Sequence, residues 1–178
     1  MTYDDLKALC EKRRSIRYFD STPLTFAEIE PLLALAQLAP SVENIQPWHF
    51  HVIFNQEMRS ELMKCCCYGN FVAGAGALLI VTCDTKAQLR APGVLWQLSD
   101  LEYSCVTAME HVLLGATTVG LGSCWVTLRH APTRQILKLT EEHQVIGGIM
   151  LGHVKRGEES PSGKHERLPL AETYTLYE

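Results

Sequence analysis

Three arginines within five residues make residues 13–17 the part of this sequence best suited to holding an anion. The segment reads Arg13-Arg14-Ser15-Ile16-Arg17. Guanidinium groups this close repel one another unless an anion or a carboxylate lies between them. Their paired N–H donors match the oxygens of a phosphate group, and the Ser15 hydroxyl adds another donor. The run by itself is also compatible with a solvated basic helix end, because positive charge suits the C-terminal end of a helix dipole.

A second segment with side chains suited to ligand binding lies at residues 39–48, between a predicted helix and a predicted strand. It reads APSVENIQPW. Its side-chain amides supply both donors and acceptors, which suits the carbonyl and N–H edge of a heteroaromatic ring. Its two prolines restrict the backbone and favour a rigid binding surface. A simple helix-to-strand connection, with Trp48 in the core, is the alternative.

Two further segments could contact a ligand, at residues 120–127 and 163–169. The first reads GLGSCWVT and follows a long predicted helix, and the second reads GKHERLP and is basic. Gly120 or Gly122 can end the helix in the left-handed conformation, and glycine also lets backbone N–H groups approach a ligand closely. Taken alone, the first segment is compatible with a simple helix cap and the second with a polar loop.

Other catalytic and metal-binding patterns are missing from the sequence. It contains no G-x-G-x-x-G after a strand, no H-E-x-x-H and no G-x-S-x-G, so neither a Rossmann nicotinamide domain nor zinc or serine hydrolysis is expected. His49 and His51 share one face of a predicted strand, but no third ligand is evident. Cys65-Cys66-Cys67 are neighbours on a predicted helix and point about 100° apart, so they do not close on one ion. We therefore predict no metal site and interpret the triplet as structural thiols.

Length and charge restrict the class of protein. The 178 residues fit one compact domain, residues 1–178, and 47% of them are hydrophobic against 20% charged, an ordinary globular balance. A net charge of −4 excludes broad attraction to nucleic acid or anionic membranes. The polar residues 1–5 lack the pattern of a secretory signal, and the longest apolar run, residues 72–83, is too short to span a bilayer. We expect a cytoplasmic protein whose seven cysteines are reduced.

The elements that must position these segments follow from periodicity and capping signals. Thr25 with Glu28 forms a predicted capping box, which begins a helix that ends near Pro40. Residues 77–83, ALLIVTC, are typical of a central strand buried on both faces. Further helices are expected at 2–12, 56–67, 93–119 and 132–139, a loop at 155–166, and further strands at 48–54, 123–127, 145–151 and 172–177. This pattern indicates an α+β or mixed α/β domain.

Taken together, the four segments resemble the FMN-dependent nitroreductase family, over residues 6–170. The family shows, in this order, an R-R-S-x-R start, an A-P-S-x-x-N-x-Q-P-W segment, a long helix followed by G-L-G-S-C-W, and a late basic loop ending in arginine. The resemblance implies an α+β fold with a central mixed or antiparallel sheet flanked by helices. It also implies an intertwined homodimer with FMN at the interface, where residues 172–177 could add to the partner's sheet.

The resemblance further assigns roles to individual residues. Ligands of the FMN phosphate and ribityl chain would be Arg13, Arg14, Ser15, Arg17 and, near the end of the chain, Arg167. Residues reaching the isoalloxazine ring of the partner subunit would be Pro40, Ser41, Val42 and Asn44. The backbone lying along the flavin near its reactive N5 would be that of Trp125, Val126 and Thr127. Asn70 would contact the flavin, and either Lys164 or His165 would assist at the phosphate.

The reaction implied by the resemblance is electron transfer from NADH or NADPH, through FMN, to a small acceptor of the nitroaromatic, quinone or enone type. Ping-pong kinetics are expected, and no side chain is assigned as an obligate catalytic acid or base, since solvent can supply protons. Three alternatives stay open. They are a non-catalytic flavin carrier, a reductive dehalogenase and a flavin-fragmenting enzyme on the same fold.

Overall fold

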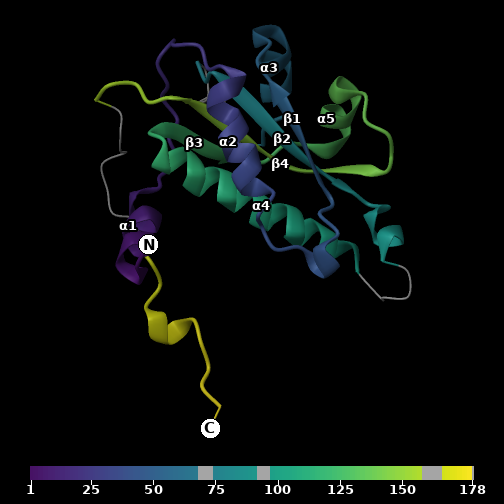
Figure 1. Ribbon diagram of the computed structural model, residues 1–178. Coiled ribbons are helices and arrows are strands. Elements are labelled where there is room, and N and C mark those ends of the chain that lie inside the picture. The colour runs from purple at the N-terminus through teal and green to yellow at the C-terminus, as the bar shows by residue number, and fades with distance from the viewer. Residues whose placement is uncertain (68–73, 92–96, 158–165, 178) are drawn as a thin grey trace.

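The computed structural model describes residues 1–67, 74–91, 97–157 and 166–177 (Figure 1). Its centre is a four-stranded sheet with the strand order β1-β2-β4-β3. The strands are β1 (Trp48–Ile53), β2 (Ala77–Asp84), β3 (Leu121–Val126) and β4 (His143–His153). All three strand pairs are antiparallel. The expected α+β fold with a central sheet is therefore confirmed, and of the two predicted sheet types the antiparallel one is present.

Strand β2 is the most deeply buried element. Every residue from Ala77 to Cys83 is buried, and β1 and β4 pair with it on its two sides. A strand buried on both faces needs an apolar side chain at almost every position, which the ALLIVTC run supplies. The predicted central strand is confirmed, and its position places β1 and β3 at the two opposite edges of the sheet.

Helices cover both faces of the sheet (Figure 1). One core cluster joins α2 (Phe26–Ala36) and α4 (Leu98–Thr118) to one face, and a second cluster joins α3 (Gln56–Met63) and α5 (His130–Leu137) to the other. Gly115 allows α2 to approach α4 closely, because a Cβ at this position would lie 2.8 Å from Leu35 Cδ2. The long predicted helix is thus confirmed as the spine of the domain from Leu98 to Thr118. Its expected beginning at residue 93 lies outside the described residues.

The N-terminal caps follow the sequence signals. At the beginning of α2, the Thr25 backbone N–H and the Thr25 hydroxyl both donate to Glu28 Oε2 at 2.8 Å. Thr2 and Asp5 form an equivalent capping box at the beginning of α1 (Tyr3–Lys12). These contacts satisfy N–H groups that the first turn of a helix leaves without partners.

Several predicted elements were wrong in extent or type. Strands β3 and β4 each begin two residues before the prediction, β4 ends at His153 rather than residue 151, and α2 ends at Ala36 rather than near Pro40. Helix α3 ends at Met63 rather than residue 67, because the chain turns at Lys64 and Cys66 then pairs with Leu128. Helix α5 begins at His130, two residues before the prediction, since a proline is tolerated anywhere in a first helical turn. The terminal strand is absent from the described residues. There a short 3₁₀ turn, Leu170–Glu172, precedes an exposed tail that extends away from the body of the molecule (Figure 1).

All seven cysteines are free thiols. Cys83 of β2 and Cys105 of α4 are fully buried, and a hydrogen bond to Cys83, together with burial, raises the pKa of the Cys105 thiol. Buried thiols of this kind act as packing groups. In the part of the chain that the structure describes, no group of three or more histidine, cysteine or acidic side chains could hold a metal ion. Nor is any described helix long and apolar enough to cross a membrane.

Three histidines gather on the sheet face opposite α4. The ring centroids of His49 and His51 lie 4.7 Å apart, and those of His49 and His143 lie 6.4 Å apart. Nε2 of His51 is 3.1 Å from the Thr82 hydroxyl oxygen. Burial, with a smaller effect of the two neighbouring histidines, lowers the pKa of His51 to about 4. His51 is therefore neutral in the folded protein at neutral pH.

Acidification should weaken the fold through His51. The unfolded chain takes up a proton near pH 6.5, whereas the folded chain resists it until about pH 4, so stability is lost as the pH falls between these values. Between pH 7 and pH 5 we expect a loss of about 1 kcal/mol, discounted for the partial exposure of the ring. Urea unfolding of the wild type and of His51→Gln at both pH values measures this loss. Equal losses in the two proteins would exclude His51 as its source.

Candidate cofactor site

The arginine-containing segment lies along the edge strand β3. The Ile16 N–H donates to the Ser123 carbonyl at 2.8 Å, and Ser15 forms a parallel bridge with Ser123. Gly122 makes this approach possible, because a Cβ there would lie 2.9 Å from Ile16 Cγ2. Further along, Phe19 pairs with Val154 next to the end of β4. We call residues 13–20 the strap, since they bind across this edge of the sheet.

The arginines of the strap are half-buried. Arg14 Nη1 donates to the Glu11 carbonyl at 2.6 Å and to the Arg13 carbonyl at 3.2 Å, and Arg17 Nη1 donates to the Ser15 carbonyl at 3.2 Å. Within the described ranges, neither Arg13 nor Arg14 forms an ion pair with a carboxylate. Half-buried guanidinium groups without a counter-charge are unfavourable unless an anion joins them.

The positive charge of the strap affects the pKa of the Cys124 thiol. Burial raises the pKa of this thiol, and the guanidinium groups of Arg17 and Arg13 and the Ser15 hydroxyl oppose that rise. Arg13, Ser15 and Arg17 of the strap therefore all act on the same residue of β3.

Strand β3 ends at Val126, and the next residue, Thr127, is bound to the segment that follows α3. Val126 is buried, Trp125 is half-buried, and Thr127 is exposed. The Thr127 carbonyl accepts a hydrogen bond from the Cys67 N–H at 2.9 Å. Because the side chains of Trp125 and Val126 pack into the two core clusters, a ligand at this edge would meet mainly backbone here.

Residues 40–46 form a loop with an unusual backbone. Glu43, Asn44 and Gln46 have φ values of 44°, 56° and 53°, in the left-handed region that non-glycine residues rarely adopt. Side-chain contacts hold this conformation. Gln46 N–H donates to Ser41 Oγ at 3.0 Å, and Gln46 Nε2 donates to Asn44 Oδ1 at 3.1 Å. Such strain, of order 1–3 kcal/mol per residue, is typical of functional loops.

The N-terminal half of α4 anchors this loop. The Val42 N–H donates to Ser104 Oγ at 3.2 Å, and the Thr107 hydroxyl donates to the Pro40 carbonyl at 2.9 Å. From the other side, Arg90 Nη1 donates to the Ile45 carbonyl at 2.9 Å. Ser104, Thr107 and Arg90 were not predicted as site residues. The signal that could have indicated two of them is a pair of hydroxyls three residues apart on this helix.

The strap and the 40–46 loop lie at opposite edges of the sheet. The strap pairs with β3, whereas the loop leads directly into β1, and β2 and β4 separate these strands. Figure 1 shows the same separation, with α1 on the left and the connection from α2 to β1 on the lower right. Three strand spacings amount to about 14 Å before side chains are considered. One chain therefore does not join its two predicted half-sites into one pocket.

Of the remaining predicted site residues, only Arg167 lies in the described part of the chain. Asn70, Lys164 and His165 lie outside the described residues. Arg167 is exposed in the tail, and no contact joins it to the strap among the residues that the structure covers. Its role at the phosphate stays a prediction.

Comparison with known sequences identifies the class of protein to which this fold, with its strap and its 40–46 loop, belongs. Residues 10–153 match the model of the Nitroreductase family. A protein of Archaeoglobus fulgidus that carries the name NADH dehydrogenase/NAD(P)H nitroreductase is 32% identical over 148 residues, covering 80% of this chain and 82% of its own. The 5,6-dimethylbenzimidazole synthase of Rhodospirillum rubrum is 30% identical over 190 residues, covering 93% and 88%.

Solved structures agree on the fold. A nitroreductase-type protein of Desulfovibrio desulfuricans, in complex with FMN, superposes with a TM-score of 0.82 at 24% identity and covers 99% of both chains. This chain belongs to the Nitroreductase family.

Proposed function

We propose that this protein is an FMN-dependent oxidoreductase that passes electrons from NADH or NADPH to a small organic acceptor with ping-pong kinetics. The observation that carries the proposal is the strap. Its half-buried Arg13 and Arg14 have no carboxylate partner in the described chain, and they lie beside the edge strand of a nitroreductase fold. Relatives named as NAD(P)H nitroreductases support the reaction type.

The residues present fit FMN. A phosphate group would offset the charge of Arg13, Arg14 and Arg17, with the Ser15 hydroxyl as a further donor. Arg167 would join them if the tail folded back, and the amide of Asn44 would face the ring edge. Bound FMN would supply the electron transfer itself. The contribution of the chain is to neutralise the phosphate, to hold the ring by backbone groups, and to keep the 40–46 loop preorganised so that little entropy is lost on binding.

The proposal includes a homodimer in which each flavin site takes the strap from one chain and the 40–46 loop from the other. The separation of these two segments within one chain supports it. So do exposed apolar side chains on α4, where Leu98, Tyr103 and Val106 are 44%, 65% and 38% exposed. Apolar groups gathered on one helix face are typical of a subunit interface.

Spectroscopy with a matched variant tests the cofactor and the donor. The purified protein should carry a yellow flavin that bleaches on anaerobic addition of NADH or NADPH and recovers when a quinone is added. Arg13→Gln should weaken FMN binding about tenfold or more, because a charge-assisted hydrogen bond contributes about 1.5–3 kcal/mol. Lys7→Gln, which removes the same charge from the exposed face of α1, should leave affinity unchanged.

A colourless protein that takes up no FMN would contradict the proposal. A bound flavin that neither nicotinamide reduces would instead favour a non-catalytic carrier.

A complementation experiment tests the shared site. Arg13→Glu removes the phosphate side, and Asn44→Arg places a bulky side chain on the ring side, so each variant alone should bind little FMN. A mixed dimer, isolated through two different affinity tags, places both substitutions in one site and leaves the other intact. About one site in two should then hold FMN. Mixed dimers without FMN would show that the site is built differently.

A second candidate function is fragmentation of the flavin, which the likeness to 5,6-dimethylbenzimidazole synthase over 93% of this chain favours. The two candidates differ in what happens to reduced FMN when oxygen is the only acceptor. For the reductase we expect the full absorbance of oxidised FMN to return, with no 5,6-dimethylbenzimidazole detected by mass spectrometry. Stoichiometric loss of FMN with formation of that product would replace the reductase by the synthase.

A further inference from the structure

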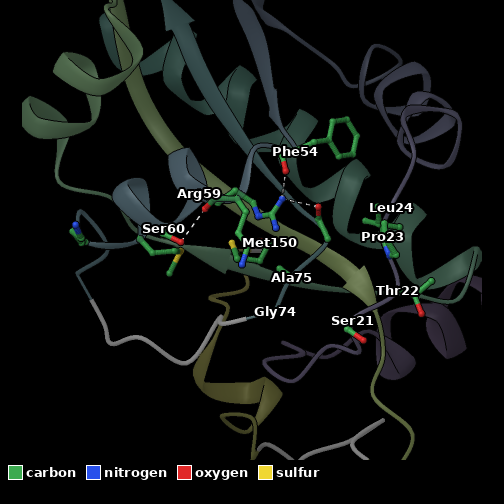
Figure 2. Close-up of a pocket in the computed structure, with 14 residues that line it drawn as sticks. Ser21, Thr22, Pro23, Leu24, Phe54, Arg59, Ser60, Gly74, Ala75 and Met150 are labelled. Carbon is green, nitrogen blue, oxygen red and sulfur yellow. Dashed lines mark hydrogen bonds between the residues drawn. The ribbon is translucent and has the colours of Figure 1, made fainter.

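A cavity of about 700 Å³ lies between α3 and the two segments 21–24 and 74–76. Figure 2 shows Arg59 and Ser60 of α3 on one side of it, and Ser21, Thr22 and Leu24 on the other. None of the described residues assigned to the flavin lines this cavity. The described lining is therefore distinct from the described residues of the candidate cofactor site, and the volume is within the range of pockets that hold small organic ligands.

The described lining of the cavity carries positive charge only. Among the described residues that line it, Arg59 and Lys64 are the ionisable ones, and none is acidic. Arg59 Nη1 donates to the carbonyl of Gly76 at 3.0 Å and to the carbonyl of Phe54 (Figure 2). These two hydrogen bonds fix the guanidinium between the end of β1 and the beginning of β2.

The guanidinium of Arg59 keeps donors available for a ligand. No described residue supplies a partner for its Nε or Nη2, and none supplies a carboxylate. Partial burial lowers the pKa of Arg59, which reflects the unfavourable desolvation of this charge. An anion in the cavity would offset that cost.

The remaining walls are of two kinds. Leu24 and Met150 are buried apolar side chains, and Met63 is half-buried. Ser21, Thr22 and Ser60 supply hydroxyl groups. A ligand that matches both kinds has an apolar body and a polar, negatively charged end.

We propose that this cavity binds a small organic carboxylate with an apolar body, its carboxylate group held by Arg59 and Lys64. The planar guanidinium matches a carboxylate through two parallel N–H donors, and the ammonium group of Lys64 adds a second positive charge. The apolar body lies against Leu24, Met63 and Met150.

Fluorine NMR with 4-fluorobenzoate as the probe tests the site on the protein as isolated. We expect saturable broadening of the fluorine signal, with 4-fluorobenzamide, which has the same ring but no charge, binding at least tenfold more weakly. Ser60 lines the cavity and is exposed, so Ser60→Asp adds a negative charge to the lining and should reduce affinity for 4-fluorobenzoate at least tenfold. Because Ser60 is exposed on α3, we expect this variant to keep the fold.

Two further variants complete the test. Lys64→Gln should weaken binding severalfold, whereas Lys138→Asn should not change it. The control removes one positive charge at an exposed position whose left-handed backbone, with φ of 52°, asparagine tolerates. Equal affinity for the acid and the amide, or an affinity that Ser60→Asp leaves unchanged, would overturn the proposal. Binding that alters the visible flavin spectrum and is insensitive to Ser60→Asp would place the probe at the flavin and overturn it as well.

Discussion

Burial of β2 on both faces is the constraint on which the rest of the structure depends. Because Ala77 to Cys83 must be covered above and below, α2 and α4 occupy one face and α3 and α5 the other. The same burial requires partners for the backbone groups of β2 on both sides. Strands β1 and β4 supply them, and β1 and β3 are the edges. The loop before β1 and the strap beside β3 are then held apart by the sheet itself. The shared flavin site proposed for two chains is a consequence of this strand order.

Buried positive charge and backbone strain, both unfavourable in free energy, are concentrated at the proposed ligand sites. The strap holds half-buried arginines, and the 40–46 loop holds three residues with left-handed backbones. Neither feature stabilises the fold, and both are maintained by contacts outside themselves, from Ser123 to the strap and from Ser104 and Thr107 to the loop. Arg59, in the cavity beside α3, has the same character, since its contacts to two carbonyls fix a charge that has no carboxylate partner among the described residues. In each case packing elsewhere stabilises a local arrangement that favours a ligand.

Local signals predicted the regular elements well and the irregular ones poorly. The apolar run of β2 and the capping box at Thr25 each follow from chemistry within a few residues, and both are confirmed. The end of α3 depends on pairing between Cys66 and Leu128, which are 62 residues apart and carry no shared local pattern. The alternation of residues 172–177 suits a strand, but a strand also requires a neighbouring edge, and no such pairing forms within the described chain. For the site, the motifs indicated the strap and the loop. That they lie at opposite edges depends on strand order, which adjacent residues do not encode.

The strap also affects the association of the protein with other molecules in solution. An edge strand presents a row of N–H and C=O groups that can pair with any other extended chain, and such edges promote association of one sheet with another. By bridging to Ser123 and by bringing the positive charges of Arg13 and Arg17 near β3, the strap occupies part of this edge and repels a second copy of it. The arginines proposed to hold a phosphate therefore also protect the sheet from adding strands where it should end.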